Sequence, residues 1–208
     1  MIRFSRLIIA IFAIFLSQGA YAQLGVSKRA HRTFSNLTIG AKLGMNMQRT
    51  FGSNNIFKGS YSQGIMGGAF GSFYKSERFA VRVELLAKKA KLDYLPYHAT
   101  IKCFYLDLPV MAEYLIGDVV WLQAGLQYTR MLSARNTGIG SGSDVRKLWF
   151  NSNDLGLVVG AEVVITPRLI GGARYVHGLF DLNGLNDPSK GVWKNSGLQI
   201  TAGYRFFN

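Results

Sequence analysis

The sequence predicts an all-β fold: an eight-stranded antiparallel up-and-down transmembrane β-barrel that follows a cleaved signal peptide. Three observations lead to this prediction. Apolar and polar residues alternate with a period of two along eight segments of the chain. The connections between these segments are alternately short and long, and the polar positions inside the segments carry charges of both signs.

Residues 1–22 have the three parts of a secretory signal peptide. Two arginines precede an uninterrupted apolar run at residues 7–16, and the small-residue pattern Ala20-Tyr21-Ala22 follows. The alternative is a membrane-anchoring helix, which would need about 20 apolar residues to span a bilayer. The run is much shorter than that, so we expect export and cleavage.

The remainder of the chain is long enough for one domain with a sizeable interior. Residues 23–36 are basic and lack periodicity, so we expect a flexible lead-in there and the barrel domain at 37–208. Cys103 is the only cysteine, which excludes an internal disulfide framework. The 24 glycines and the aromatic content of 13% suit a tightly coiled barrel with aromatic girdles.

Period-two alternation defines the expected strands. In the last segment, apolar side chains from Leu198 to Phe206 alternate with polar or very small ones. Five more segments are equally clear, and two are weaker. In the weaker segment 62–74, which is rich in glycine, the pattern does not show which residues face inward and which face outward. The clear segments are 37–46, 79–88, 105–114, 122–129, 155–165 and 198–206, and the weaker ones are 62–74 and 169–180.

The connections favour a membrane barrel over a soluble one. Three are tight turns, at residues 75–78, 116–118 and 166–168, and four are longer, at 49–61, 92–100, 133–152 and 182–196. In an up-and-down barrel every second connection lies at the same rim. Outer-membrane barrels have short periplasmic turns and long external loops, an asymmetry that a soluble barrel does not need.

The charged residues inside the segments indicate which face meets lipid. A soluble barrel would place them outside in water, whereas on a lipid face each Arg or Lys near the midplane would cost about 2–4 kcal/mol. In a narrow lumen, opposite charges can pair. We therefore predict a lumen charge network of Lys42, Arg82, Glu84, Asp107, Glu113, Glu162, Arg174 and Arg205.

Two further features favour the membrane. The apolar faces have up to six positions, enough for the ~9–11 residues of a tilted spanning strand. Aromatic residues near strand ends fit interfacial girdles. They are Tyr74, Tyr114, Trp121, Tyr204 and Phe206.

The formal net charge of +13 raises the question of an anionic partner. Export argues against nucleic acid and favours outer-membrane lipid or lipopolysaccharide. An equally weighted alternative is that the basic residues simply fill solvated loops and the lumen. Aromatic and basic residues in the long connections form a candidate loop interaction surface. Its members are Tyr94, Tyr97, Arg146, Trp149 and Trp193.

The order of several motifs resembles the PorT-like outer-membrane barrels over nearly all of residues 37–207. The motifs are Val83-Glu84-Leu85-Leu86, Phe104-Tyr105-Leu106-Asp107-Leu108-Pro109-Val110, Ala124-Gly125-Leu126, Leu132-Ser133-Ala134, Asp154-Leu155-Gly156-Leu157-Val158-Val159-Gly160-Ala161, Ala173-Arg174-Tyr175, Gly178-Leu179 and Gly203-Tyr204-Arg205-Phe206. The resemblance implies an outer-membrane barrel, and one branch of that family is associated with type IX protein secretion. It implies no catalytic motif. The aromatic end of the chain resembles the signal read by barrel-assembly machinery, although Asn208 departs from it.

The chemistry-bearing residues do not suggest an enzyme. His31, His98 and His177 have no Ser and acid at a spacing that suggests a triad. With a single cysteine they form no metal site, and we expect no cofactor. The sequence therefore favours a non-enzymatic barrel with a structural role, a cell-surface interaction or an accessory role in secretion. A lipid-modifying enzyme and a narrow channel remain the alternatives.

Overall fold

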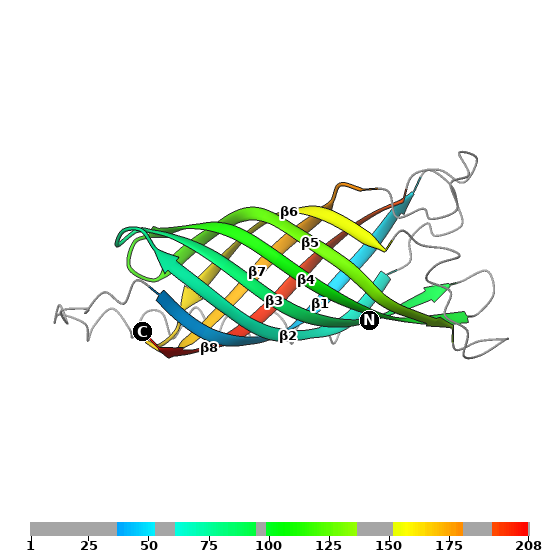
Figure 1. Cartoon of the computed structure of the whole chain (residues 1–208), viewed down its shortest axis with the longest axis horizontal. Coiled ribbons are helices and arrows are strands. Elements are labelled where there is room, and N and C mark those ends of the chain that lie inside the picture. The colour runs from blue at the N-terminus through cyan, green and yellow to red at the C-terminus, as the bar shows by residue number, and fades with distance from the viewer. Residues whose placement is uncertain (1–36, 53–60, 95–98, 137–151, 181–192, 208) are drawn as a thin grey trace, which may run out of the picture. The chain divides into compact units, whose positions relative to one another are not determined.

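The computed structural model describes residues 37–52, 61–94, 99–136, 152–180 and 193–207 (Figure 1). The expected signal peptide and lead-in lie outside these residues. Within the described part of the chain, no helix is long and apolar enough to cross a membrane.

Eight strands form a closed barrel in which every strand pairs antiparallel with its neighbours in the sequence. The first strand pairs with the last and closes the sheet. The strands are β1 (Leu37–Gly52), β2 (Tyr61–Tyr74), β3 (Phe79–Tyr94), β4 (Ala99–Ile116), β5 (Val120–Asn136), β6 (Asn153–Val164), β7 (Leu169–Gly178) and β8 (Trp193–Phe207). They cross the barrel obliquely in Figure 1, as closure of a sheet requires. The predicted fold class is confirmed.

The predicted tight turns are confirmed at one rim. Lys75 donates its backbone N–H to the carbonyl of Phe79, and Ile165 does the same to Leu169. Between β4 and β5 the chain reverses at Gly117, whose φ is 63°. That conformation is open to glycine without steric cost.

The strands extend farther toward the long connections than the alternation predicted. β1 continues to Gly52, β5 continues to Asn136, and β8 begins at Trp193. β3 likewise continues to Tyr94, and β4 begins at Ala99. All four predicted long connections, at 49–61, 92–100, 133–152 and 182–196, were therefore too long. The backbone ladder does not depend on the apolar–polar pattern, which changes there: in β5 the inward Met131 and Ala134 are apolar and the outward Arg135 is charged.

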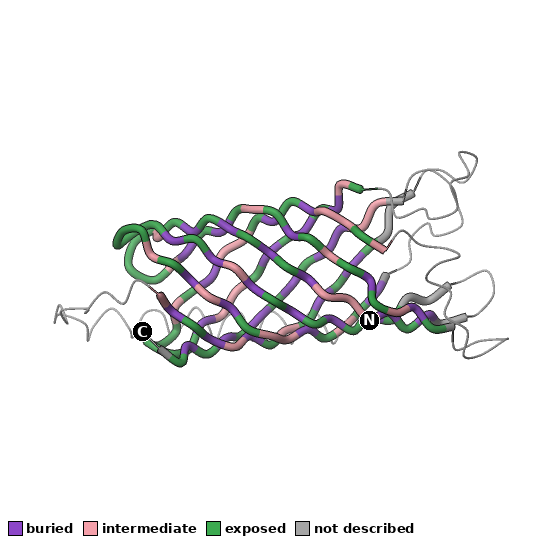
Figure 2. Tube along the Cα trace, viewed as in Figure 1, coloured by how far each residue is buried: buried purple, intermediate pink, exposed green. Residues whose placement is uncertain are grey.

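The faces of the strands are assigned by their exposure (Figure 2). Leu43 is 71% exposed, whereas the preceding Lys42 is 3% exposed. In the Gly-rich β2, Ile65 points outward and Phe70 points inward. The barrel thus has an apolar outer surface and a polar interior. A soluble barrel would have the reverse arrangement.

The expected aromatic girdle is wrong at Trp121 and at Tyr74, which both lie on the inner face of their strands. Trp121 is 4% exposed and lies inside the barrel, where its ring meets Tyr74 edge-on with centroids 5.7 Å apart. Trp121 has the same parity as the inward Gln123, so a position near a strand end did not decide which face it occupies. Tyr114, Tyr204 and Phe206 are exposed on the outer surface as predicted.

Small residues make room for large ones in the narrow interior. Gly40 lies opposite Phe70 in the ladder, and a Cβ there would overlap the Phe70 ring and the carbonyl oxygen of Tyr204. Gly71, on the same pair of strands, has no atom nearer than 3.9 Å to the position of a Cβ. The aromatic ring therefore requires glycine at position 40.

We predict that Gly40→Ala lowers the free energy of unfolding by about 1–3 kcal/mol, because the added methyl group overpacks the interior. Gly71→Ala is the matched control and should change it by less than about 0.5 kcal/mol. Urea-induced unfolding of the refolded barrel in lipid vesicles measures both. Equal stability of the two variants would contradict the role assigned to Gly40.

Candidate functional site

The structure places all eight residues of the predicted lumen charge network on the inner face, each at most 3% exposed. They come from β1, β3, β4, β6, β7 and β8, and alternation along each strand directs them inward. Seven of them form one continuous cluster, and Asp107 lies in a separate pair.

Glu162 and Glu84 are the centres of the cluster. Glu162 accepts hydrogen bonds from Arg82 and from Lys42, the latter with Nζ–Oε2 at 3.1 Å. Glu84 accepts from Lys42 at 2.6 Å and from Nη1 of Arg174 at 2.7 Å. Lys42 therefore bridges two carboxylates, and these contacts join strands that are not neighbours in the sheet.

Glu113 extends the cluster along the lumen. Its carboxylate lies 3.1 Å from Nε of Arg82 and accepts hydrogen bonds from Gln123 at 2.7 Å and Ser72 at 3.3 Å. The Phe70 ring lies beside Arg82 and Lys42, with its centroid 4.6 Å from Cζ of Arg82. Such a cation–π contact adds attraction where water is excluded.

Lys88 is a lumen residue that the predicted network omitted. Its Nζ lies 3.0 Å from Asp107 and 4.8 Å from the centroid of the Tyr105 ring. The signal was present in the sequence, because Lys88 has the same parity in its strand as Arg82 and Glu84. Asp107 thus has its partner here and not in the main cluster.

Opposite charges nearly cancel in the lumen. The buried charged residues of the described chain are five cations (Lys42, Arg82, Lys88, Arg174, Arg205) and four anions (Glu84, Asp107, Glu113, Glu162), which leaves a net charge of +1. In an eight-stranded barrel the interior is just wide enough for side chains to fill. The arrangement therefore links the walls of the barrel to one another and occupies the space that a pore would need.

The predicted loop interaction surface falls outside what the structure describes. Tyr97, Arg146 and Trp149 lie in undescribed segments. Tyr94 is the last residue of β3 and Trp193 the first of β8, and only their backbone positions are described.

One pair that could carry chemistry was missed by the sequence. Nδ1 of the exposed His177 lies 2.8 Å from Oγ of Ser196, because these residues are directly opposite in the β7–β8 ladder. Ser196 itself is only 3% exposed. In the described part of the chain, no hydrogen bond or ion pair joins His177 to a carboxylate, so the third member of a triad is absent there. No group of three or more potential metal-ligating His, Cys, Asp or Glu residues occurs among the described residues.

A closed up-and-down barrel with an apolar exterior and a charged interior defines the class of transmembrane β-barrels. The chain belongs to the family described as outer membrane protein beta-barrel domain, whose model matches residues 21–184. The protein is therefore an outer-membrane protein. A search of curated protein sequences finds no match to the chain.

The chain is similar in structure to several solved bacterial proteins. Ail of Yersinia pestis, solved with the heparin analogue sucrose octasulfate, is 14% identical with a TM-score of 0.54, over 82% of this chain and 99% of that one. A second Ail structure is 14% identical with a TM-score of 0.51, over 81% and 98%. Neisserial surface protein A is 16% identical with a TM-score of 0.48, over 83% and 98%. At these identities the likeness concerns the fold.

We predict that Glu162→Gln lowers the free energy of unfolding by about 3–5 kcal/mol, because Arg82 and Lys42 lose the charge of a shared buried partner. The matched control is Glu77→Gln in the exposed turn between β2 and β3, which should cost less than about 0.5 kcal/mol. Unfolding in urea, followed by heat-modifiable gel migration, measures the two. A Glu162→Gln barrel as stable as the control would show that the lumen charges do not support the fold.

Proposed function

We propose that this protein is a non-enzymatic outer-membrane barrel whose role is to interact at the cell surface through its long connections. The observation that carries the proposal is the filled lumen. Side chains around Glu84 and Glu162 occupy the interior. The external connections are therefore the part of the chain that is available to contact a partner. The candidate contact residues remain Tyr94, Tyr97, Arg146, Trp149 and Trp193.

The relatives support this proposal by analogy of fold. Ail is described as the attachment invasion locus protein, and one of its structures holds a sulfated heparin analogue. The formal net charge of +13 becomes +11 without Arg3 and Arg6 of the proposed signal peptide, and this excess suits a polyanionic partner. We extend the analogy to the class of ligand only, a sulfated or phosphorylated glycan.

A second candidate is an accessory role in protein secretion. It rests on the motifs that resemble the PorT-like barrels, among them Asp107-Leu108-Pro109 in β4 and Gly203-Tyr204-Arg205-Phe206 in β8. Such a role would bring secretion-complex proteins as partners, in addition to the barrel-assembly machinery that inserts the protein. Co-purification of the native barrel with envelope proteins from crosslinked cells tests it.

The two remaining alternatives have weaker support. A lipid-modifying enzyme would have to use the pair formed by His177 and Ser196, whose hydroxyl is buried and for which the described chain supplies no acid. A channel would require water to replace the ion pairs around Glu162. We therefore favour the surface-interaction role.

The proposal predicts loss of polyanion binding when the candidate loop residues are removed together. Alanine at Tyr94, Tyr97, Arg146, Trp149 and Trp193 should weaken binding to immobilised heparin at least thirtyfold, corresponding to about 2 kcal/mol for a single strong contact. Surface plasmon resonance on the refolded barrel measures this change.

The matched control removes charge from the opposite rim, with Lys75→Ala and Arg78→Ala in the turn between β2 and β3. This variant should bind heparin as the unaltered barrel does. Undiminished binding by the loop variant, provided that it still migrates as a folded barrel, would reject the loops as the interaction surface.

We also propose that residues 1–22 are removed on export and that residues 23–36 then form the lead-in to the barrel at 37–208. N-terminal sequencing of the protein from an outer-membrane fraction should begin at Gln23. Ala20→Arg and Ala22→Arg together should leave an uncleaved precursor. A mature protein that begins at Met1 would refute the signal peptide.

A further inference from the structure

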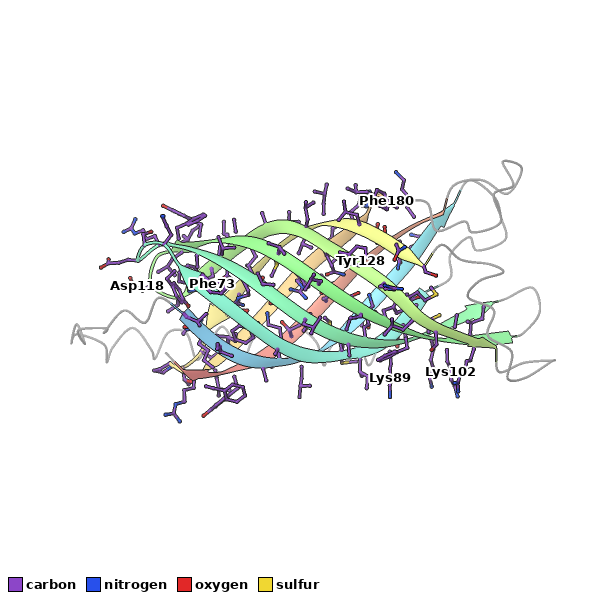
Figure 3. The ribbon with its side chains drawn as sticks, viewed as in Figure 1. Phe73, Lys89, Lys102, Asp118, Tyr128 and Phe180 are labelled. Carbon is purple, nitrogen blue, oxygen red and sulfur yellow. The ribbon has the colours of Figure 1, made fainter. Side chains whose placement is uncertain are left out.

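Three cations lie side by side on the outer surface of β3, β4 and β5. Lys91 is directly opposite Lys102, and Lys102 is directly opposite Arg135. All three are exposed. Neighbouring strands are about 4.8 Å apart, so the backbones of the three residues fall within about 10 Å. Figure 3 shows Lys89 and Lys102 projecting from the outside of the barrel, at the end opposite to Asp118.

Two more exposed cations lie closer to the apolar surface. Lys89 precedes Lys91 by two positions on the same face, and Arg130 is exposed on β5. We call these five residues the basic rim cluster: Lys89, Lys91, Lys102, Arg130 and Arg135. Among the side chains that the structure describes, which do not include that of Asp93, no ion pair joins a member of the cluster to a carboxylate.

This arrangement is unfavourable for the isolated barrel, because like charges directly opposite each other in a sheet repel. Along β3, Asp93 follows Lys91 by two positions and lies opposite Thr100 in the ladder. Counted as formal charge, this one acidic residue offsets one of the five cations. The opposite rim differs, since Glu77 and Asp118 stand among the cations of its turns. The basic rim cluster is thus a one-sided excess of charge that an external anion would neutralise.

The cluster lies at the depth of lipid headgroups. On β3 the outward face begins with Phe79 and stays apolar through Leu85 and Ala87 before Lys89. Ten residues at about 3.3 Å each, tilted by about 40°, rise roughly 25 Å. The apolar band of an outer-membrane barrel is also about 25 Å tall. Lys89 therefore stands where that band ends, at the rim of the long connections, which is the outer-leaflet side.

We propose that the basic rim cluster binds the phosphate groups of the outer-leaflet glycolipid, lipopolysaccharide. Lys91 and Lys102 supply compact ammonium charges, and Arg135 supplies a guanidinium fork that suits a phosphate. The apolar face below them receives the acyl chains of the same molecule. The site includes none of the five candidate loop residues, so the two surfaces can be altered separately.

The test compares three forms of the refolded barrel in detergent micelles. The site variant carries Lys91→Gln, Lys102→Gln and Arg135→Gln. The control variant carries Lys75→Gln, Arg78→Gln and Arg168→Gln, which removes the same charge from the opposite rim. The probes are fluorescent lipopolysaccharide, the same glycolipid after enzymatic dephosphorylation, and inorganic phosphate as competitor.

A basic residue near an anionic surface contributes about fivefold to binding, so three residues contribute about a hundredfold. We expect the site variant to bind lipopolysaccharide at least tenfold more weakly, and the control variant to bind as the unaltered barrel does. The dephosphorylated glycolipid should bind the unaltered barrel as weakly as lipopolysaccharide binds the site variant. Lys102→Arg alone should retain binding, because the charge is kept.

Three results would overturn the proposal. The first is equal binding by the site variant and the unaltered barrel, with both migrating as folded barrels. The second is an equal loss in the control variant, which would indicate a general charge effect. The third is full displacement of lipopolysaccharide by millimolar inorganic phosphate, which would identify a site for free anions instead of a lipid headgroup.

Discussion

The fold depends on the pairing of buried charges inside a narrow barrel. Glu162 and Glu84 are taken out of water together with Lys42, Arg82 and Arg174, and each carboxylate finds two cations at hydrogen-bonding distance. Burial of any one of these groups alone would cost several kcal/mol, so the set is stable only when it is complete. Completion requires strands from several parts of the sheet in one register, which ties the interior chemistry to the closure of the barrel.

Alternate residues of each strand have different roles: inward residues pack the interior, and outward residues contact lipid. Inward positions hold charges and amides, the aromatic rings of Phe70 and Trp121, and a glycine at position 40 that makes room for Phe70. Outward positions such as Leu43 and Ile65 meet lipid and contribute no specificity. A rigid, filled scaffold of this kind leaves recognition to its rims, where the outer surface changes from apolar to basic within two residues of Ala87.

Much of this arrangement could be predicted from the sequence because one rule, the period of two, determines which side chains share a face. It predicted the eight strands and the tight turns correctly, but not the ends of the strands at the long connections. The eight charged residues that it assigned to the lumen are buried in the structure. The same rule gives Trp121 the inward face of Gln123, and only the expectation of a girdle near strand ends placed it outside. The contact between His177 and Ser196 depends on the register of β7 against β8, which no local pattern contains. The inward direction of Lys88 follows from the same rule, because Lys88 has the same parity in its strand as Arg82 and Glu84.

The unequal lengths of the strands have a consequence for neighbours in the membrane. β4 has 18 residues and β5 has 17, whereas the next two strands around the barrel, β6 and β7, have 12 and 10. The wall at β4 and β5 therefore continues beyond the level at which β6 and β7 end. The molecule has a front and a back in the plane of the bilayer, and the proteins and lipids that surround it meet different chemistry according to direction. A barrel built in this way can impose an orientation on whatever assembles beside it.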